Sequence, residues 1–212
     1  MPLSAVYAAL GITTPPQAVL WDMDGTIVDT EADWVNNSRQ VVEDHGGYWN
    51  ADDGDFIFGA CTADHAQRLS EAVARRDGTW IAPMQLFELL HQKMLTSYQK
   101  SELLDGAAEL LTAFLEAGIP QALVTATDME LVAPALQNFP QEYFAAVVSG
   151  SDEIPGKPNP EPYLLGAQRL QADITQCLAF EDSAAGLASA RASGAITVDV
   201  NEIKVADLAK LL

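Results

Sequence analysis

The 212-residue sequence has few basic residues and no long apolar run. Lys and Arg together number 11 against 30 Asp and Glu, which gives a formal net charge of −19. A field of that sign repels nucleic acids and anionic lipid surfaces, so we expect neither as a partner. No apolar stretch reaches the roughly 20 residues that a membrane-spanning helix needs. The composition, with 49% hydrophobic and 19% charged residues, is that of a globular protein.

Cysteine is also scarce, and no basic residue precedes Arg39. Cys61 and Cys177 stand far apart without a CxxC pair, which excludes a disulfide framework and a thiolate zinc site as favoured interpretations. A secretory signal begins with basic residues, which the N-terminal segment lacks. We therefore expect a cytoplasmic protein.

Short apolar runs alternate with helical patterns over much of the chain. The runs cover 18–21, 122–124, 145–148, 177–180 and 196–200, and amphipathic segments cover 106–117, 160–170 and 184–192. Gly118 and Gly194 follow two of these segments as left-handed helix caps. This alternation predicts a doubly wound α/β fold with a parallel sheet, whose ligand site lies beyond the carboxyl ends of the strands.

Residues 32–100 differ from the rest. They hold 10 acidic and 6 basic residues, a milder imbalance than elsewhere. Apolar residues recur at helical spacing over 34–44, 64–76 and 83–98, with no convincing strand between them. The pattern predicts a small helical insert.

Carboxylate pairs follow two of the predicted strands. Asp22 and Asp24 follow the first, and Glu181 and Asp182 follow the fourth. Paired like charges cost energy unless a cation compensates them, and oxygen ligands suit a hard cation such as Mg²⁺. The alternative is turn formation at the first pair and helix capping at the second.

One further strand end and one loop carry groups that could bind an anion. Thr125 offers a hydroxyl and Ala126 a backbone N–H, although a threonine before a helix is most often an N-cap. Lys157 is the only basic residue between 101 and 168, and it stands in a stiff loop rich in proline. An exposed loop lysine is the alternative there, but the prolines favour a fixed position that balances nearby carboxylates.

Together these groups suit phosphoryl transfer. Mg²⁺ and Lys157 would suppress the repulsion between a phosphate and a carboxylate nucleophile. Asp22 would attack phosphorus to give an aspartyl-phosphate. Asp24 would protonate the leaving alcohol and then activate water.

The four segments resemble the haloacid dehalogenase-like hydrolase superfamily, in particular its branch with a helical cap, which includes β-phosphoglucomutases and sugar-phosphate phosphatases. The resemblance rests on DMDGTIVDTE at 22–31, on Thr125, on Lys157 with its prolines, and on EDS at 181–183. It implies a Rossmann-like core of residues 1–31 and 101–212 and a cap of residues 32–100. It also implies Asp22 as nucleophile, Asp24 as acid and base with a backbone oxygen on magnesium, Thr125 and Lys157 on phosphate, and Glu181 and Asp182 at the metal.

The resemblance also separates possible reactions. Asp24 argues against dehalogenation, which needs no second aspartate. β-Phosphoglucomutases carry a histidine where this chain has Trp34 and a cap arginine where it has Thr62. Without that arginine a mutase lacks its second phosphate clamp; Arg75 and Arg76 could supply one, although a solvated helix face is the favoured interpretation. We therefore favour a phosphatase acting on a small phosphorylated metabolite, with a sugar phosphomutase as the alternative.

Other interpretations remain open. A phosphorylation-gated signalling receiver shares several of these residue types, but it has no use for a cap. A silent binding protein would keep the fold without turnover. Cap aromatics could line a substrate pocket or form the cap core, and the three histidines fit core or surface positions. These aromatics are Trp34, Trp49, Phe56 and Phe58. We expect a monomer.

Overall fold

The computed structural model describes residues 3–57 and 60–212 and divides them into two compact units. One unit comprises Met1–Asp29 with Glu102–Leu212, and the other comprises Thr30–Ser101. No helix among the described residues is both long enough and apolar enough to cross a membrane.

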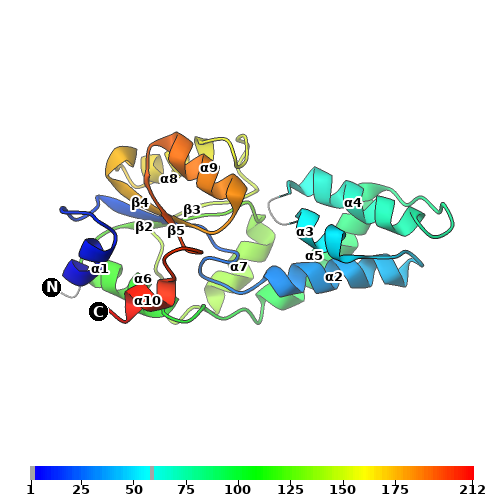
Figure 1. Cartoon of the computed structure of the whole chain (residues 1–212), viewed down its shortest axis with the longest axis horizontal. Helices are drawn as coiled ribbons and strands as arrows, with labels where there is room; N and C mark the ends of the chain where they lie inside the picture. The colour runs from blue at the N-terminus through cyan, green and yellow to red at the C-terminus, as the bar shows by residue number, and fades with distance from the viewer. Residues whose placement is uncertain (1–2, 58–59) are drawn as a thin grey trace. The chain divides into compact units, whose positions relative to one another are not determined.

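A five-stranded parallel sheet forms the centre of the first unit (Figure 1). Its strands are β1 (Ala18–Trp21), β2 (Gln121–Val124), β3 (Ala146–Val148), β4 (Cys177–Glu181) and β5 (Ile196–Asp199), in the order β3-β2-β1-β4-β5. Trp21 is in register with Leu123 on one side and Phe180 on the other. Every residue of β1, β2 and β4 is buried, which explains the apolar runs 18–21, 122–124 and 177–180 within them.

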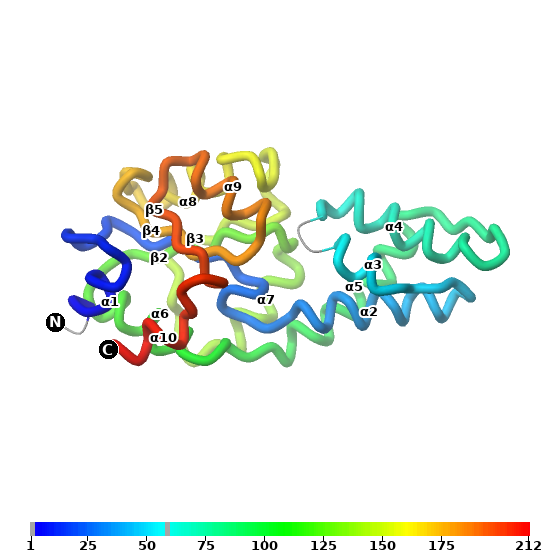
Figure 2. The backbone as a smooth tube through the Cα atoms, in the orientation of Figure 1, coloured from blue at the N-terminus to red at the C-terminus, as the bar shows by residue number. Residues whose placement is uncertain are grey.

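Helices cover both faces of this sheet. In Figure 1, α8 (Glu161–Arg169) and α9 (Ala184–Ser193) lie on one side, and α6 (Ala107–Glu116) and α10 (Val205–Ala209) lie on the other. α8 packs on β1, β2 and β3, whereas α9 packs on β4 and β5. The short helix α1 (Leu3–Ala9) lies beside α10, so the two ends of the chain meet at one end of the unit (Figure 2). The remaining elements are α7 (Met129–Gln137) and the 3-10 turn Ile174–Gln176.

The alternation of side chains along each strand divides the core into two layers. Leu20 and Val124 belong to the layer beneath α8, together with Tyr163 of that helix. On the opposite face Trp21 stacks on Phe180 with ring centroids 4.1 Å apart, and Phe114 of α6 packs edge-on against Trp21. Side chains that continue the Leu20 and Val124 layer beyond the ends of the strands therefore point toward α8 and α9.

The second unit is helical. It contains α2 (Glu31–Asp44), α3 (Ala51–Ile57), α4 (Thr62–Ala74) and α5 (Pro83–Tyr98). α4 and α5 pack on each other and on α2, and α3 packs on α4. Leu69, Leu90 and Met94 are fully buried and form part of its core.

The expected α/β fold with a helical insert between the first two strands is confirmed. The five strands begin and end within one residue of the expected positions, and Gly118 and Gly194 have the left-handed backbone of helix caps, with φ of 72° and 90°. The sequence patterns did not reveal α1, α3, α7, α10 or the 3-10 turn. Most of these are short, and Pro134 lies inside α7, where proline normally argues against a helix.

Candidate active site

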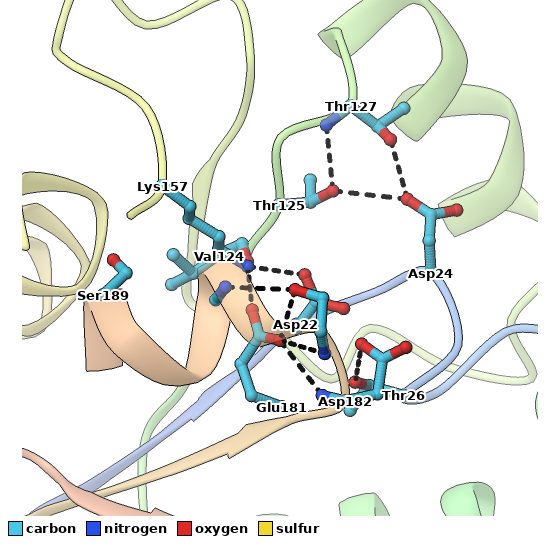
Figure 3. A network of polar contacts seen from close by, with 12 residues as sticks. Asp22, Asp24, Thr26, Val124, Thr125, Thr127, Lys157, Glu181, Asp182 and Ser189 are labelled. Carbon is cyan, nitrogen blue, oxygen red and sulfur yellow. Dashed lines mark hydrogen bonds and ion pairs between the residues drawn. The ribbon is translucent and has the colours of Figure 1, made fainter. Parts of the chain in front are cut away.

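Asp22 lies directly after β1, at the carboxyl end of the sheet. Its backbone N–H donates to the carbonyl of Phe180 on β4, which fixes it between the two central strands. Asp22 is buried, with 7% of the residue exposed, and Lys157 Nζ lies 2.6 Å from Asp22 Oδ1 (Figure 3). The strand end thus holds one carboxylate in contact with one ammonium group.

Glu181 is the last residue of β4 and is fully buried. Its Oε1 accepts from Lys157 Nζ and from the Tyr163 hydroxyl, the latter at 3.0 Å. Its Oε2 accepts from the backbone N–H groups of Asp182 and Ser183 at 3.0 and 3.1 Å and from the Ser183 hydroxyl at 3.2 Å. This carboxylate is held by five donors, which leaves it a single orientation.

The loop that carries Lys157 is itself tied down. Lys157 Nζ donates to the Val124 carbonyl at 3.0 Å in addition to its two carboxylate partners. The Asn159 side chain accepts from the N–H of Glu161 at the start of α8, and the Asn159 carbonyl accepts from the Ser189 hydroxyl on α9 at 2.6 Å. The lysine is therefore fixed in the site and is not an exposed loop residue.

Burial and charge together set the protonation of this cluster. Burial and the Glu181 charge raise the pKa of Asp22 well above its usual range, against the opposing effect of Lys157. Burial alone would lower the pKa of Lys157, but the Asp22 and Glu181 carboxylates outweigh it and raise that pKa, so the side chain is a cation at neutral pH. Burial, followed by the Glu181 charge, raises the pKa of Tyr163, so the phenol stays protonated and can donate.

Asp24 has different partners from Asp22. Its Oδ2 accepts from the Thr127 hydroxyl at 2.7 Å and lies 3.5 Å from the Thr125 hydroxyl (Figure 3). Thr125 Oγ1 in turn accepts from the backbone N–H of Thr127 at 3.0 Å, and Ala126 lies exposed in the turn between them. Thr125, Ala126 and Asp24 therefore lie together next to the carboxylate cluster, as expected from their positions after neighbouring strands.

Asp182 completes the acidic group. Thr26 Oγ1 lies 3.3 Å from its Oδ1, and the Asn201 side chain donates to its backbone carbonyl at 2.6 Å. One carboxylate oxygen each from Asp22, Glu181 and Asp182 lie within 4.8 Å of one another.

These residues fit a divalent cation. Three carboxylates against one ammonium leave excess negative charge, which a divalent cation would neutralise. Hard cations such as Mg²⁺ take oxygen ligands of this kind. The Asp24 side chain is outside this triad, because its carboxylate is turned toward Thr127.

Sequence reasoning missed four residues that contact this group: Tyr163, Thr127, Thr26 and Asn201. Thr26 and Thr127 stand within two residues of predicted site residues, and this proximity was the available signal. Tyr163 and Asn201 carry no such local signal, because only the packing of α8 and the turn after β5 bring them to the site.

In the helical unit, Arg75, one of the two arginines considered as an alternative phosphate clamp, is already paired with a carboxylate. Arg75 makes a bidentate pair with the fully buried Asp53 carboxylate, at 2.5 and 2.7 Å. Arg75 therefore lies at the exposed surface, as expected, but its guanidinium is paired with Asp53 and is not available as a phosphate clamp in this arrangement. Thr62 is the first residue of α4.

The cap aromatics divide between core and surface. Trp34 is half-buried; it donates to the Tyr98 hydroxyl at 3.2 Å and packs against the buried His65, so it lies against the core of this unit. Trp49 is buried, whereas Phe56 is 40% exposed. Phe58 lies outside the described residues.

Comparison with known proteins shows the family of the chain. The haloacid dehalogenase-like hydrolase family matches residues 16–194. The chain belongs to this family. It is accordingly a hydrolase, and the matched span contains every predicted site residue.

Relatives of this hydrolase include named phosphatases. The chain is 31% identical to the phosphorylated carbohydrates phosphatase of Thermotoga maritima, over 84% of this chain and 82% of that protein. It is 29% identical to the fructose-1-phosphate phosphatase of Escherichia coli, over 86% and 95%. The β-phosphoglucomutase structure from Clostridium difficile has the same fold, with a TM-score of 0.73, 19% identity and coverage of 90% of this chain and 88% of that one.

Proposed function

We propose that this hydrolase is a magnesium-dependent phosphatase that removes phosphate from a small phosphorylated metabolite of the sugar-phosphate class. The observation that carries the proposal is the buried contact of Lys157 with both Asp22 and Glu181 at the carboxyl end of the sheet. A buried lysine among carboxylates suits a phosphatase site, because its positive charge opposes the repulsion between the carboxylates and an incoming phosphate. The named activities of the two relatives support the sugar-phosphate class.

In the first step Asp22 is the nucleophile. One of its oxygens forms a bond to phosphorus while the bond from phosphorus to the ester oxygen breaks. The Asp24 carboxyl donates its proton to the leaving oxygen, which departs as an alcohol. The Lys157 ammonium, the Thr125 hydroxyl and the Ala126 N–H bind phosphoryl oxygens and oppose the charge that develops on them.

In the second step the aspartyl-phosphate is hydrolysed. The Asp24 carboxylate takes a proton from water, and the water oxygen bonds to phosphorus as the bond to Asp22 breaks. Inorganic phosphate leaves, and both aspartates return to their starting states. The Thr127 hydroxyl, 2.7 Å from Asp24, is placed to keep this carboxylate beside the phosphate-binding turn.

Asp22, Glu181 and Asp182 would hold the magnesium ion, with the backbone oxygen of Asp24 as a further ligand. When bound, the ion neutralises carboxylate charge and polarises the phosphoryl group. A phosphomutase is less well supported, because it must clamp a second phosphate and Arg75 is paired with Asp53.

The test is release of inorganic phosphate from a panel of sugar phosphates, polyol phosphates, nucleotides and glycolytic acids, with magnesium or with EDTA. Asp22→Asn should lose at least about 1000-fold in rate while keeping its fold, because the amide is a poor nucleophile. Asp105→Asn makes the same chemical change at an exposed position and should retain the wild-type rate.

Unchanged turnover by Asp22→Asn would exclude Asp22 as nucleophile. Conversion of β-glucose 1-phosphate to glucose 6-phosphate without phosphate release would show that the enzyme is a phosphomutase and not a phosphatase.

A further inference from the structure

Tyr163 is a fully buried residue of α8 whose side chain reaches the acidic cluster. It shares a helix face with Gly166, where an added Cβ would come within 2.9 Å of a Val124 methyl group. The helix therefore lies very close to the sheet at this point. This close packing brings the Tyr163 hydroxyl to 3.0 Å from Glu181 Oε1.

Glu181 is within reach because of strand alternation. It continues the row of β4 side chains that includes Cys177 and Ala179, which pack beneath α8 and α9. A carboxylate at the end of this row enters an apolar layer, where each of its oxygens needs a hydrogen-bond donor. Glu181 Oε1 accepts from the Tyr163 hydroxyl and from Lys157.

The tyrosine also contacts the lysine. Lys157 Nζ lies 5.2 Å from the centroid of the Tyr163 ring, within the range of a cation–π interaction. One side chain therefore supplies a donor to the carboxylate and an aromatic face to the ammonium that pairs with it. The same ammonium lies 2.6 Å from Asp22.

We propose that Tyr163 is a positioning residue of the active site. Its hydroxyl shares Glu181 Oε1 with Lys157 and so keeps that ammonium from moving wholly onto Glu181, which leaves it directed at Asp22 and at an incoming phosphate. This proposal rests on the phosphatase function and adds to it a residue that does not itself touch substrate. Loss of the hydroxyl would strengthen the pair of Lys157 with Glu181 at the expense of phosphate binding.

Tyr163→Phe isolates the hydroxyl, because the ring stays and only one oxygen is removed. We expect the dissociation constant for inorganic phosphate, measured by calorimetry with magnesium present, to rise about 10-fold or more, since the change affects a hydrogen bond to a charged group. The value of kcat/KM for phosphate release should fall by a similar factor. Tyr143→Phe is the matched control, because Tyr143 is also buried and its hydroxyl pairs with Thr112. It should match the wild type in both measurements.

Tyr163→Met tests the ring separately, because methionine is apolar and flexible enough to fill the space but has neither ring nor hydroxyl. It should bind phosphate more weakly than Tyr163→Phe. Circular dichroism and thermal midpoints show whether each variant is folded. A phenylalanine variant within two-fold of the wild type in phosphate binding and in kcat/KM would overturn the positioning role.

The two proposals fail in different ways. If the wild type binds phosphate but releases none from any substrate, the phosphatase function is wrong, and the binding comparison alone decides the role of Tyr163. If the wild type releases phosphate and Tyr163→Phe is indistinguishable from it, the function stands and the positioning role is wrong. A wild type that neither binds nor releases phosphate overturns both.

Discussion

His65 provides a measurable link between burial and stability in the helical unit. It lies on α4 with only 6% of its surface exposed, and its Nε2 is 2.9 Å from the Ser38 hydroxyl on α2. The centroid of its ring lies 5.6 Å from that of the Phe87 ring and 5.7 Å from that of the Trp34 ring. Burial among these groups lowers the pKa of His65 from 6.5 to about 4.

Because the pKa of His65 is lower in the folded chain, acidification lowers the free energy of unfolding. The unfolded chain binds a proton at His65 below pH 6.5, whereas the folded chain does so only below about pH 4. The neutral imidazole therefore contributes full stability above pH 6.5, and that contribution is lost as the pH falls toward 4. With these two pKa values, lowering the pH from 7 to 5 removes about 2 kcal/mol from the free energy of unfolding.

The assay is urea unfolding at pH 7 and pH 5, in EDTA so that bound metal does not contribute. His65→Gln keeps a group that can bond to Ser38 but does not titrate. It should therefore lose about 2 kcal/mol less than the wild type between the two pH values. His91→Gln, at a half-buried position on the neighbouring helix α5, controls for loss of a histidine and should behave as the wild type does. Equal losses in the wild type and His65→Gln would refute a neutral, buried His65.

Two further substitutions test packing around charged groups. Gly186→Ala would place a Cβ against the Glu181 carboxylate, so we expect a lower thermal midpoint and at least about a 10-fold fall in kcat/KM; wild-type values for both would show that α9 can move aside. Asp53→Asn removes the charge that pairs with Arg75 and should lower the free energy of unfolding by about 2 kcal/mol in urea. A change below about 0.5 kcal/mol would mean that this pair of a buried carboxylate and an exposed arginine contributes no net stability.

Much of the fold and part of the site follow from local sequence patterns. The central strands are buried on both faces, so their apolar runs stand out from the surrounding sequence. Asp22 and Asp24 follow the first run directly, and the rule that parallel strands end at one edge places them near Glu181. These inferences need only the order of elements along the chain.

Contacts between distant segments could not be inferred in this way. Arg75 has the spacing of an exposed helix residue, and only the turn before α3 brings Asp53 to it. Tyr163 has the spacing of a core residue, and it is one; its hydroxyl matters because Glu181 ends the strand row beneath it. In each case the apolar pattern of the helix is correct but does not specify which polar group lies opposite.

Glu181 shows how many separate segments one polar group can require. Tyr163 on α8 and Ser183 at the start of α9 supply hydroxyl donors, and Gly186 leaves the space that the carboxylate occupies. None of these three residues is charged, and each has an ordinary structural explanation: a core aromatic, a helix cap and a small residue in a packed helix. Their convergence on one buried carboxylate is explained if its orientation must be fixed, because that orientation determines where the Lys157 ammonium lies. The residues that fix the orientation of Glu181 therefore lie on α8 and at the start of α9 as well as in the acidic motif itself.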